Sequence, residues 1–79
     1  MTEPELLEKA REAFVRVFGT EVEFSPALSR RNVSSWTSLR HVELIIELEK
    51  AFGVRFDGAD ATDMVSISAT LERVRSKLA

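Results

Sequence analysis

Residues 34–54, SSWTSLRHVELIIELEKAFGV, place hydroxyl residues directly before a segment whose apolar side chains recur at helical spacing. This pattern predicts a helix that begins at Thr37 or Ser38, runs to about Phe52 and is ended by Gly53. At about 100° per residue, the helix has one broad apolar face and one narrow polar arc. The apolar face contains Leu44, Ile45, Leu48, Ala51 and Phe52, and the polar arc contains Arg40, Glu43, Glu47 and Lys50. We therefore expect most of this helix to be buried.

Leu39 and Ile46 are apolar but do not belong to the predicted buried face. Their helical angles place them beside the polar arc and next to Ser38. We expect both side chains to remain partly exposed, where a partner protein is able to contact them.

The segment before residue 34 predicts a helix followed by a long loop. Thr2 is a candidate cap, with Glu5 three residues on as in a capping box, and Gly19 is placed to end the helix near Phe18. The apolar residues that recur at helical spacing in this helix are Leu6, Leu7, Ala10, Phe14, Val17 and Phe18. Residues 20–36 contain Pro26 and several serines and read as a loop. We expect this loop to be pinned to the core by Phe24, Leu28, Val33 and Trp36.

The segment after residue 54 predicts two further helices. DGADATDMV, residues 57–65, is long enough for only a turn or two of helix. Ser66 then caps a last helix whose expected inward residues are Ile67, Leu71, Val74 and Leu78. The aspartates of the short segment lack the spacing of a calcium loop, so we interpret Asp57, Asp60 and Asp63 as turn and cap residues. The predicted fold is all-α, with three main helices, one short helix and a long first loop.

Length and composition restrict the possible functions. The chain has 79 residues, of which 44% are hydrophobic and 30% charged, and no shift in composition marks a second domain. Residues 1–79 are therefore expected to form one domain. Because a domain of this size buries only about 60% of its unfolded surface, it has little room for a catalytic pocket, and we expect no enzyme. The absence of cysteine and the single histidine exclude a Cys or His metal cluster.

Charge and hydropathy exclude other partners. The net charge is -2 and the basic residues are scattered except for Arg30 and Arg31, which does not fit a nucleic-acid-binding protein. No window approaches the roughly 18 apolar residues of a membrane span, and the acidic N-terminus is unlike a signal peptide. We expect a cytoplasmic monomer that does not insert into membranes.

Residues 36–56, WTSLRHVELIIELEKAFGVRF, resemble the Asp-Ser-Leu motif and following helix of the acyl carrier proteins. The three-residue motif is weak alone, but the pattern V-E-L-x-x-x-L-E-x-x-F-G behind it makes the likeness specific, and the likeness extends over the whole chain. Members of this family are four-helix bundles whose motif serine carries 4′-phosphopantetheine, which holds acyl or aminoacyl groups as thioesters. The resemblance implies that Ser38 is the attachment site. It also implies a phosphopantetheinyl transferase, a loading enzyme and downstream synthase enzymes as partners.

Helix chemistry agrees with a phosphate at Ser38. The first turn of a helix presents unpaired N–H groups and the positive end of the dipole, which favour an anion. The alternative is that Ser38 is an ordinary residue of the first turn that assists the cap.

Two departures from the family bear on recognition. Thr37 stands where the family has aspartate, so it preserves capping but offers no carboxylate to a transferase. The second helix carries Arg40 and Lys50 beside its acidic residues, although each charge is also able to pair within the helix, as Arg40 with Glu43 or Glu47 with Lys50. We therefore expect specialised partners, and an unmodified carrier-like adaptor that only binds a partner protein remains the alternative.

Two aromatic residues near the motif have two readings each. In having Trp36 just before the motif, the chain resembles the stand-alone carriers of specialised biosynthetic pathways. Trp36 is equally interpreted as an anchor of the loop. His41 falls on the inward side of the helix, where it is either a buried, hydrogen-bonded histidine or a border of a cargo cavity. Ser38 and His41 are three residues apart, but no third orienting group supports a hydrolase.

The sequence therefore predicts a stand-alone carrier in which each site residue has one role. Ser38 is the attachment point and Thr37 is the cap. The residues expected to contact visiting enzymes are Leu39, Arg40, Glu43, Ile46 and Glu47, of which Leu39 and Ile46 supply apolar contact and Glu43 and Glu47 orient the partner.

Overall fold

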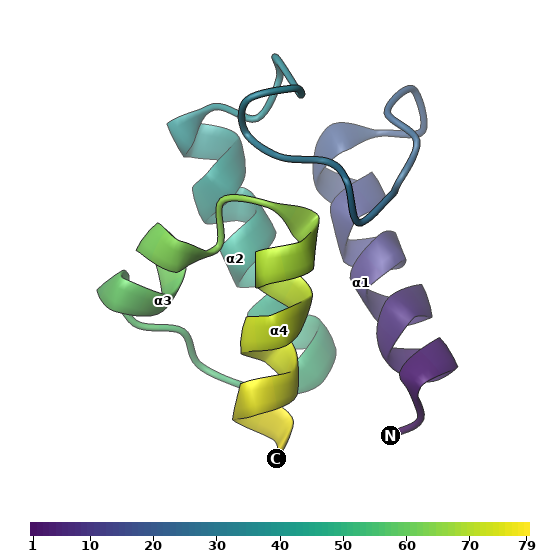
Figure 1. Ribbon diagram of the computed structural model, residues 1–79, viewed down its shortest axis with the longest axis vertical. Coiled ribbons are helices and arrows are strands. Elements are labelled where there is room, and N and C mark those ends of the chain that lie inside the picture. Colours follow the sequence, from purple (N-terminus) through teal and green to yellow (C-terminus); the bar gives the residue numbers. More distant parts are fainter.

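The computed structural model describes all of residues 1–79 and contains four helices and no strand. In chain order these are α1 (Glu3–Phe18), α2 (Ser38–Phe52), α3 (Gly58–Asp63) and α4 (Ile67–Leu78). Packing joins α1 to α2 and α3 to α4, and Figure 1 shows α4 in front of α2 with α3 at one side and α1 at the other. The predicted all-α fold, with three main helices, one short helix and a long first loop, is confirmed.

A side-chain cap starts every helix, which explains why the predicted boundaries are correct. In each case a side-chain oxygen accepts the backbone N–H three residues further on, and the caps are Thr2, Thr37, Asp57 and Ser66. Two glycines end α1 and α2, namely Gly19 with φ 80° and Gly53 with φ 65°. Because side chains are disfavoured at positive φ, glycine suits both positions.

The hydrophobic core lies among α1, α2, α4 and the long loop. Phe14 of α1 and Val74 of α4 are fully buried, and Leu48 of α2 is 1% exposed. Val33 and Trp36 of the loop are buried in the same core, while Phe24 and Leu28 pack against it from the edge. The predicted loop anchors are therefore confirmed. Of these anchors, Phe24 and Trp36 join Phe14 and Phe18 in an aromatic cluster with centroid separations of 4.5 to 6.3 Å.

The prediction for the end of α4 is wrong at one residue. Ile67, Leu71 and Val74 are buried as expected, but the side chain of Leu78 is 39% exposed. Leu78 is the last helical residue, so no further turn follows to cover it. Helical periodicity predicts which face of a helix is apolar, but it does not predict where the neighbouring elements end.

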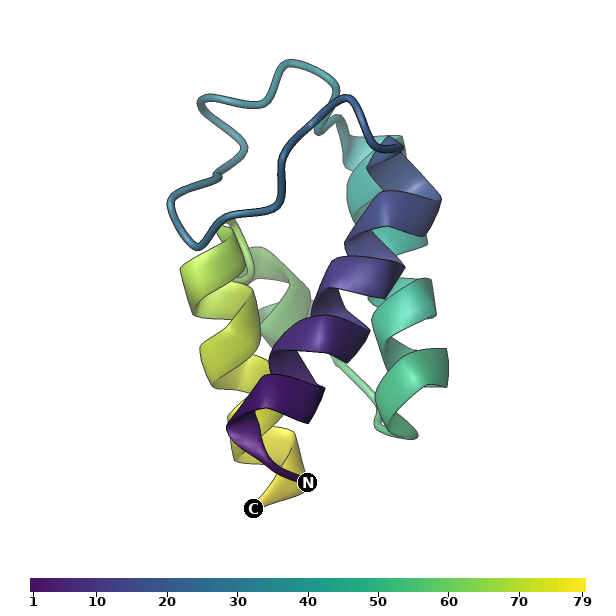
Figure 2. The ribbon, with the colours of Figure 1, turned by 90° about the vertical axis from the view of Figure 1, so that its right-hand side faces the viewer.

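The chain termini and Ser38 lie at opposite ends of the helical bundle. Figures 1 and 2 both show the two termini at one end, with the long loop and the start of α2 at the other. At the first end, Arg75 of α4 forms an ion pair with Glu3 of α1. The loop end carries Ser38. None of the four helices combines the length and the apolar character needed to cross a membrane.

Candidate functional site at the start of α2

Ser38 is the first residue of α2, and its hydroxyl takes no part in capping the helix. Thr37 is the cap, with extended backbone angles (φ -83°, ψ 175°), and its Oγ1 accepts the backbone N–H of Arg40 at 3.3 Å. Ser38 is exposed, and none of its hydrogen bonds goes from the hydroxyl to the backbone. Thr37 therefore has the predicted capping role, and the hydroxyl of Ser38 faces solvent at the positive end of the helix dipole.

The contact nearest to the Ser38 hydroxyl comes from the long loop. Nη2 of Arg30 lies 3.4 Å from Oγ of Ser38, at the long end of the hydrogen-bonding range. The sequence identified Arg30 only as one of a basic pair in the loop. Eight residues separate Arg30 from Ser38, and no helical or strand periodicity relates them, so no sequence signal predicts this contact.

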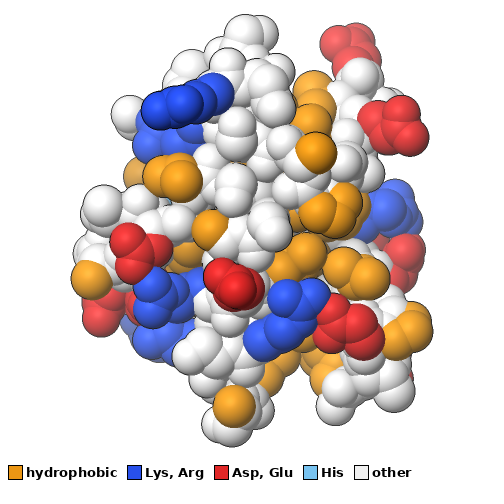
Figure 3. All heavy atoms as spheres, in the orientation of Figure 1, with side chains coloured by type: hydrophobic (Ala, Val, Ile, Leu, Met, Phe, Trp, Pro, Cys, Tyr) orange, Lys and Arg blue, Asp and Glu red, His pale blue; other side chains and the backbone are white.

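The surroundings of Ser38 carry positive charge without acidic residues in sequence proximity. Between Glu23 and Glu43 there is no Asp or Glu, whereas Arg30, Arg31 and Arg40 fall in that interval. The first turn of α2 has no acidic residue, although acids are common in the first turn of a helix because they complement the dipole. Figure 3 shows basic side chains gathered over the long loop and the start of α2. An anion attached to Ser38 is therefore attracted by the nearby positive charges and meets little repulsion from acidic side chains.

Exposed apolar side chains continue along α2 away from Ser38. The predicted exposure is confirmed for Leu39, which is 69% exposed, and for Ile46, which is 44% exposed. Val42 is also exposed, although it was not predicted to be. Its spacing of three residues from Leu39 and four from Ile46 is the signal that identifies it. We call Leu39, Val42 and Ile46 the apolar stripe.

The polar arc of α2 partly serves contacts within the chain. Arg40 donates to the backbone carbonyl of Val17 at 3.2 Å, in the last turn of α1, and lies 3.7 Å from Glu43. Glu47 pairs with Arg16 of α1 at 3.3 Å. The considered pairing of Glu47 with Lys50 is therefore wrong, because α1 brings a closer cation. Of the two acidic residues of the arc, Glu43 has no ion pair with α1, and its cation is Arg40 of the same helix.

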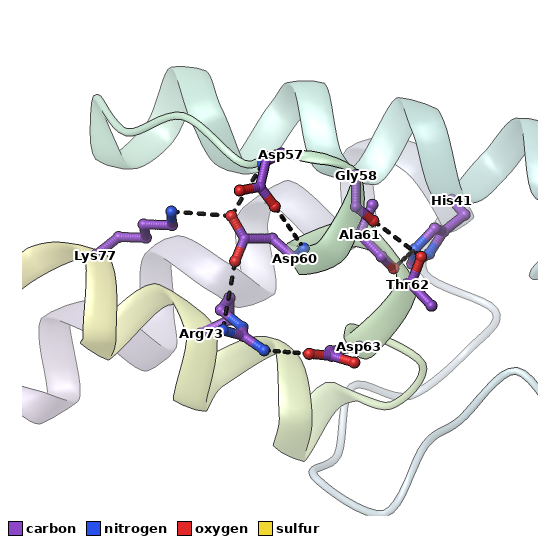
Figure 4. Close-up of polar contacts among 9 residues, drawn as sticks. All are labelled: His41, Asp57, Gly58, Asp60, Ala61, Thr62, Asp63, Arg73 and Lys77. Atoms are coloured by element: carbon purple, nitrogen blue, oxygen red, sulfur yellow. Dashed lines mark hydrogen bonds and ion pairs between the residues drawn. The ribbon is translucent and has the colours of Figure 1, made fainter.

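The opposite side of α2 carries a buried histidine with both ring nitrogens in use. Trp36 donates its Nε1–H to Nδ1 of His41 at 2.9 Å, and Nε2–H of His41 donates to the carbonyl of Ala61 at 2.8 Å. The indole has only a donor and the carbonyl only an acceptor, so the neutral Nε2–H tautomer is selected. Figure 4 shows His41 directed at α3. The interpretation as a buried, hydrogen-bonded histidine is confirmed, and the ring has no free nitrogen to act as a base for Ser38.

The aspartates around α3 are occupied by caps and ion pairs (Figure 4). Asp57 and Asp60 form a reciprocal capping box. Asp60 is buried and also pairs with Lys77 at 2.9 Å and Arg73 at 3.4 Å. The backbone N–H of Asp57, and then Lys77, lower the pKa of Asp60. Cap roles are thus confirmed for Asp57 and Asp60, whereas Asp63 pairs with Arg73 instead.

No group of three or more Asp, Glu, His or Cys side chains converges in a way that would hold a metal ion. Comparison with models of known protein families and with curated proteins finds no match to this chain.

Proposed function

We propose that this protein is a carrier whose Ser38 hydroxyl bears 4′-phosphopantetheine, and that it holds acyl or aminoacyl intermediates for other enzymes. The observation that carries the proposal is the exposed Ser38 hydroxyl, left free of backbone bonds at the first residue of α2, within a sequence that resembles the acyl carrier motif. When bound, the arm supplies a terminal thiol that holds the cargo as a thioester.

The residues present at the site fit a phosphate group. Thr37 caps α2 and so leaves the Ser38 hydroxyl available. The dipole of a 15-residue helix and the nearby guanidinium of Arg30 favour a negative charge at this position. No carboxylate within the first turn of α2 opposes it.

The remaining residues of the exposed side serve recognition in this proposal, and the protein itself performs no catalysis. The apolar stripe offers contact area beside the attachment point, and Glu43 supplies a charge that orients the visiting enzyme. Arg40 and Glu47, which join α2 to α1, hold the recognition surface in place. The partners are a phosphopantetheinyl transferase, a loading enzyme and downstream synthase enzymes.

The basic surroundings of Ser38 support specialised partners, because carriers of this family typically present an acidic second helix. We therefore propose that the protein serves a specialised biosynthetic pathway, and we further propose that it acts as a monomer in the cytoplasm. Light scattering of the purified chain checks the last point, and a stable dimer would contradict it.

Intact mass spectrometry tests the attachment. After incubation with coenzyme A and a transferase of broad specificity, the wild type should gain one phosphopantetheinyl mass. Ser38→Ala should gain none, while Ser35→Ala, which removes a nearby exposed hydroxyl of the loop, should gain the same mass as the wild type. A wild type that several transferases leave unmodified would contradict the proposal.

The second candidate is an unmodified helical adaptor, which Thr37 favours because it offers no carboxylate to a transferase. In that case the apolar stripe would be the functional surface and Ser38 would have no covalent role. Mass spectrometry of the protein purified from its native cells separates the two, since a carrier is found with the arm and an adaptor is found without it.

A further inference from the structure

We infer that Arg30 is a positioning residue that binds the phosphate ester carried by Ser38. This inference rests on the proposed function and deepens it, since it assigns the loop a role in holding the base of the arm. Oγ of Ser38, the oxygen to which the phosphate would be attached, already lies 3.4 Å from Nη2 of Arg30.

The chemistry of the contact improves when the hydroxyl becomes an ester. A neutral hydroxyl offers the guanidinium only a long hydrogen bond at 3.4 Å, with no negative charge on the acceptor. A phosphate diester keeps a negative charge on its non-bridging oxygens, and the planar fork of an arginine matches such oxygens well. In the modified protein the contact therefore becomes an ion pair between the guanidinium and the phosphate.

The charge of Arg30 is not neutralised within the protein. No carboxylate lies within 4.0 Å of its guanidinium, although most arginines of this chain have such a partner. The paired arginines are Arg11, Arg16, Arg40, Arg73 and Arg75. An arriving phosphate consequently has no competing anion to displace from Arg30.

The backbone of Arg30 is held by a segment distant in sequence. Its N–H donates to the carbonyl of Val65 at 3.0 Å, and the N–H of Ile67 donates to the carbonyl of Leu28 at 2.9 Å. These bonds flank an isolated bridge between Ser29 and Ser66, the cap of α4. The start of α4 thereby fixes the part of the loop that carries Arg30, so the position of Arg30 is a feature of the fold.

Arg31 is the matched control for Arg30. It is the next residue, it is exposed, and it has the same charge, but its side chain forms no hydrogen bond with Ser38. Both arginines should attract a phosphate on Ser38 about equally at long range, whereas only Arg30 should contact it directly.

The test uses a phosphate that does not depend on a transferase. Phosphoserine is introduced at position 38 through an expanded genetic code, and its second ionisation, normally near pH 6, is followed by 31P NMR. With Arg30 present, the pKa of this phosphate should be lowered, and Arg30→Gln should raise it again by about half a pH unit. Arg31→Gln should change it by much less, and Arg30→Lys should restore part of the shift.

The same variants are then compared as the phosphopantetheinylated protein. We expect the 31P resonance of the diester to move in Arg30→Gln and to stay in place in Arg31→Gln. Equal responses of the two variants in the phosphoserine protein, or no response in either, would overturn the inference about Arg30 even if Ser38 is fully modified by a transferase. A wild type that accepts no arm would instead overturn the proposed function, whatever the phosphoserine titration gives.

Discussion

The two sides of α2 carry similar apolar side chains and have opposite surroundings. Leu48 and His41 are buried, and His41 bonds to Trp36 of the loop and to Ala61 of α3, whereas Leu39, Val42 and Ile46 are exposed. Because the two buried and the three exposed residues belong to one helix, their burial depends on their angle around the helix axis and on the elements packed there. The comparison separates the residues that hold the fold from those left for recognition, and substitutions on each side test that separation.

The largest effect is expected for Leu48→Ala. Truncation of a fully buried leucine costs about 2 to 5 kcal/mol, against a total stability of about 5 kcal/mol for a small domain. Thermal unfolding followed by circular dichroism should show a melting temperature that is lower than that of the wild type by roughly 8 to 40 °C. Leu39→Ala is the control on the exposed side, and similar melting curves for the two variants would refute the assigned orientation of α2.

The next effect is expected for His41→Leu. This substitution removes the partner of the buried Trp36 N–H and of the partly buried Ala61 carbonyl, and an unpaired buried polar group costs about 1 to 3 kcal/mol. The melting temperature should fall, and the tryptophan emission should change because its hydrogen bond is lost. An unchanged emission spectrum would show that the indole of Trp36 does not depend on His41.

A smaller effect is expected at α3, which covers His41 and is held by Asp60. Since the folded protein lowers the pKa of Asp60, the carboxylate stabilises the fold above the unfolded pKa of about 3.9. That contribution is lost as the pH falls through the still lower pKa of the folded state. Asp60→Asn should therefore lower the melting temperature at pH 7, and the difference from the wild type should shrink toward pH 2. A difference independent of pH would indicate a steric cause.

The smallest effect on stability is expected for Ile46→Ala, on the apolar stripe. Surface substitutions usually change stability by less than about 0.5 kcal/mol. The melting temperature should stay nearly unchanged, while loading or transfer by the cognate enzyme should slow. A destabilised Ile46→Ala protein with normal turnover once folded would reverse the assignment of the two sides.

Local sequence signals predicted the helices well because the signals are themselves local. A cap and the N–H it binds are three residues apart, and Gly19 and Gly53 mark the helix ends through their own backbone angles. The exposure of Leu39 and Ile46 followed from helical angles, and Val42 was missed although the same angles include it. What these positions share is that the relevant neighbours lie on the same helix.

The contacts that were not predicted join segments distant in sequence. Arg16 reaches Glu47 across 31 residues, and Nε2 of His41 meets the carbonyl of Ala61 across 20 residues. Arg30 meets Ser38 from a part of the loop whose backbone bonds to the segment at the start of α4. Such contacts depend on how the elements pack, and no periodicity or spacing in a single sequence specifies them.

The placement of both termini at the end opposite Ser38 has a practical consequence for handling the molecule (Figure 2). A fusion partner, a fluorescent label or a surface tether attached at either terminus projects away from the hydroxyl. A copy immobilised on a sensor chip would thus present Ser38 and the apolar stripe to the enzyme flowing over it. Binding of candidate transferases and synthases can be screened with the protein fixed in one orientation, and the same geometry suits insertion between two domains of a longer chain.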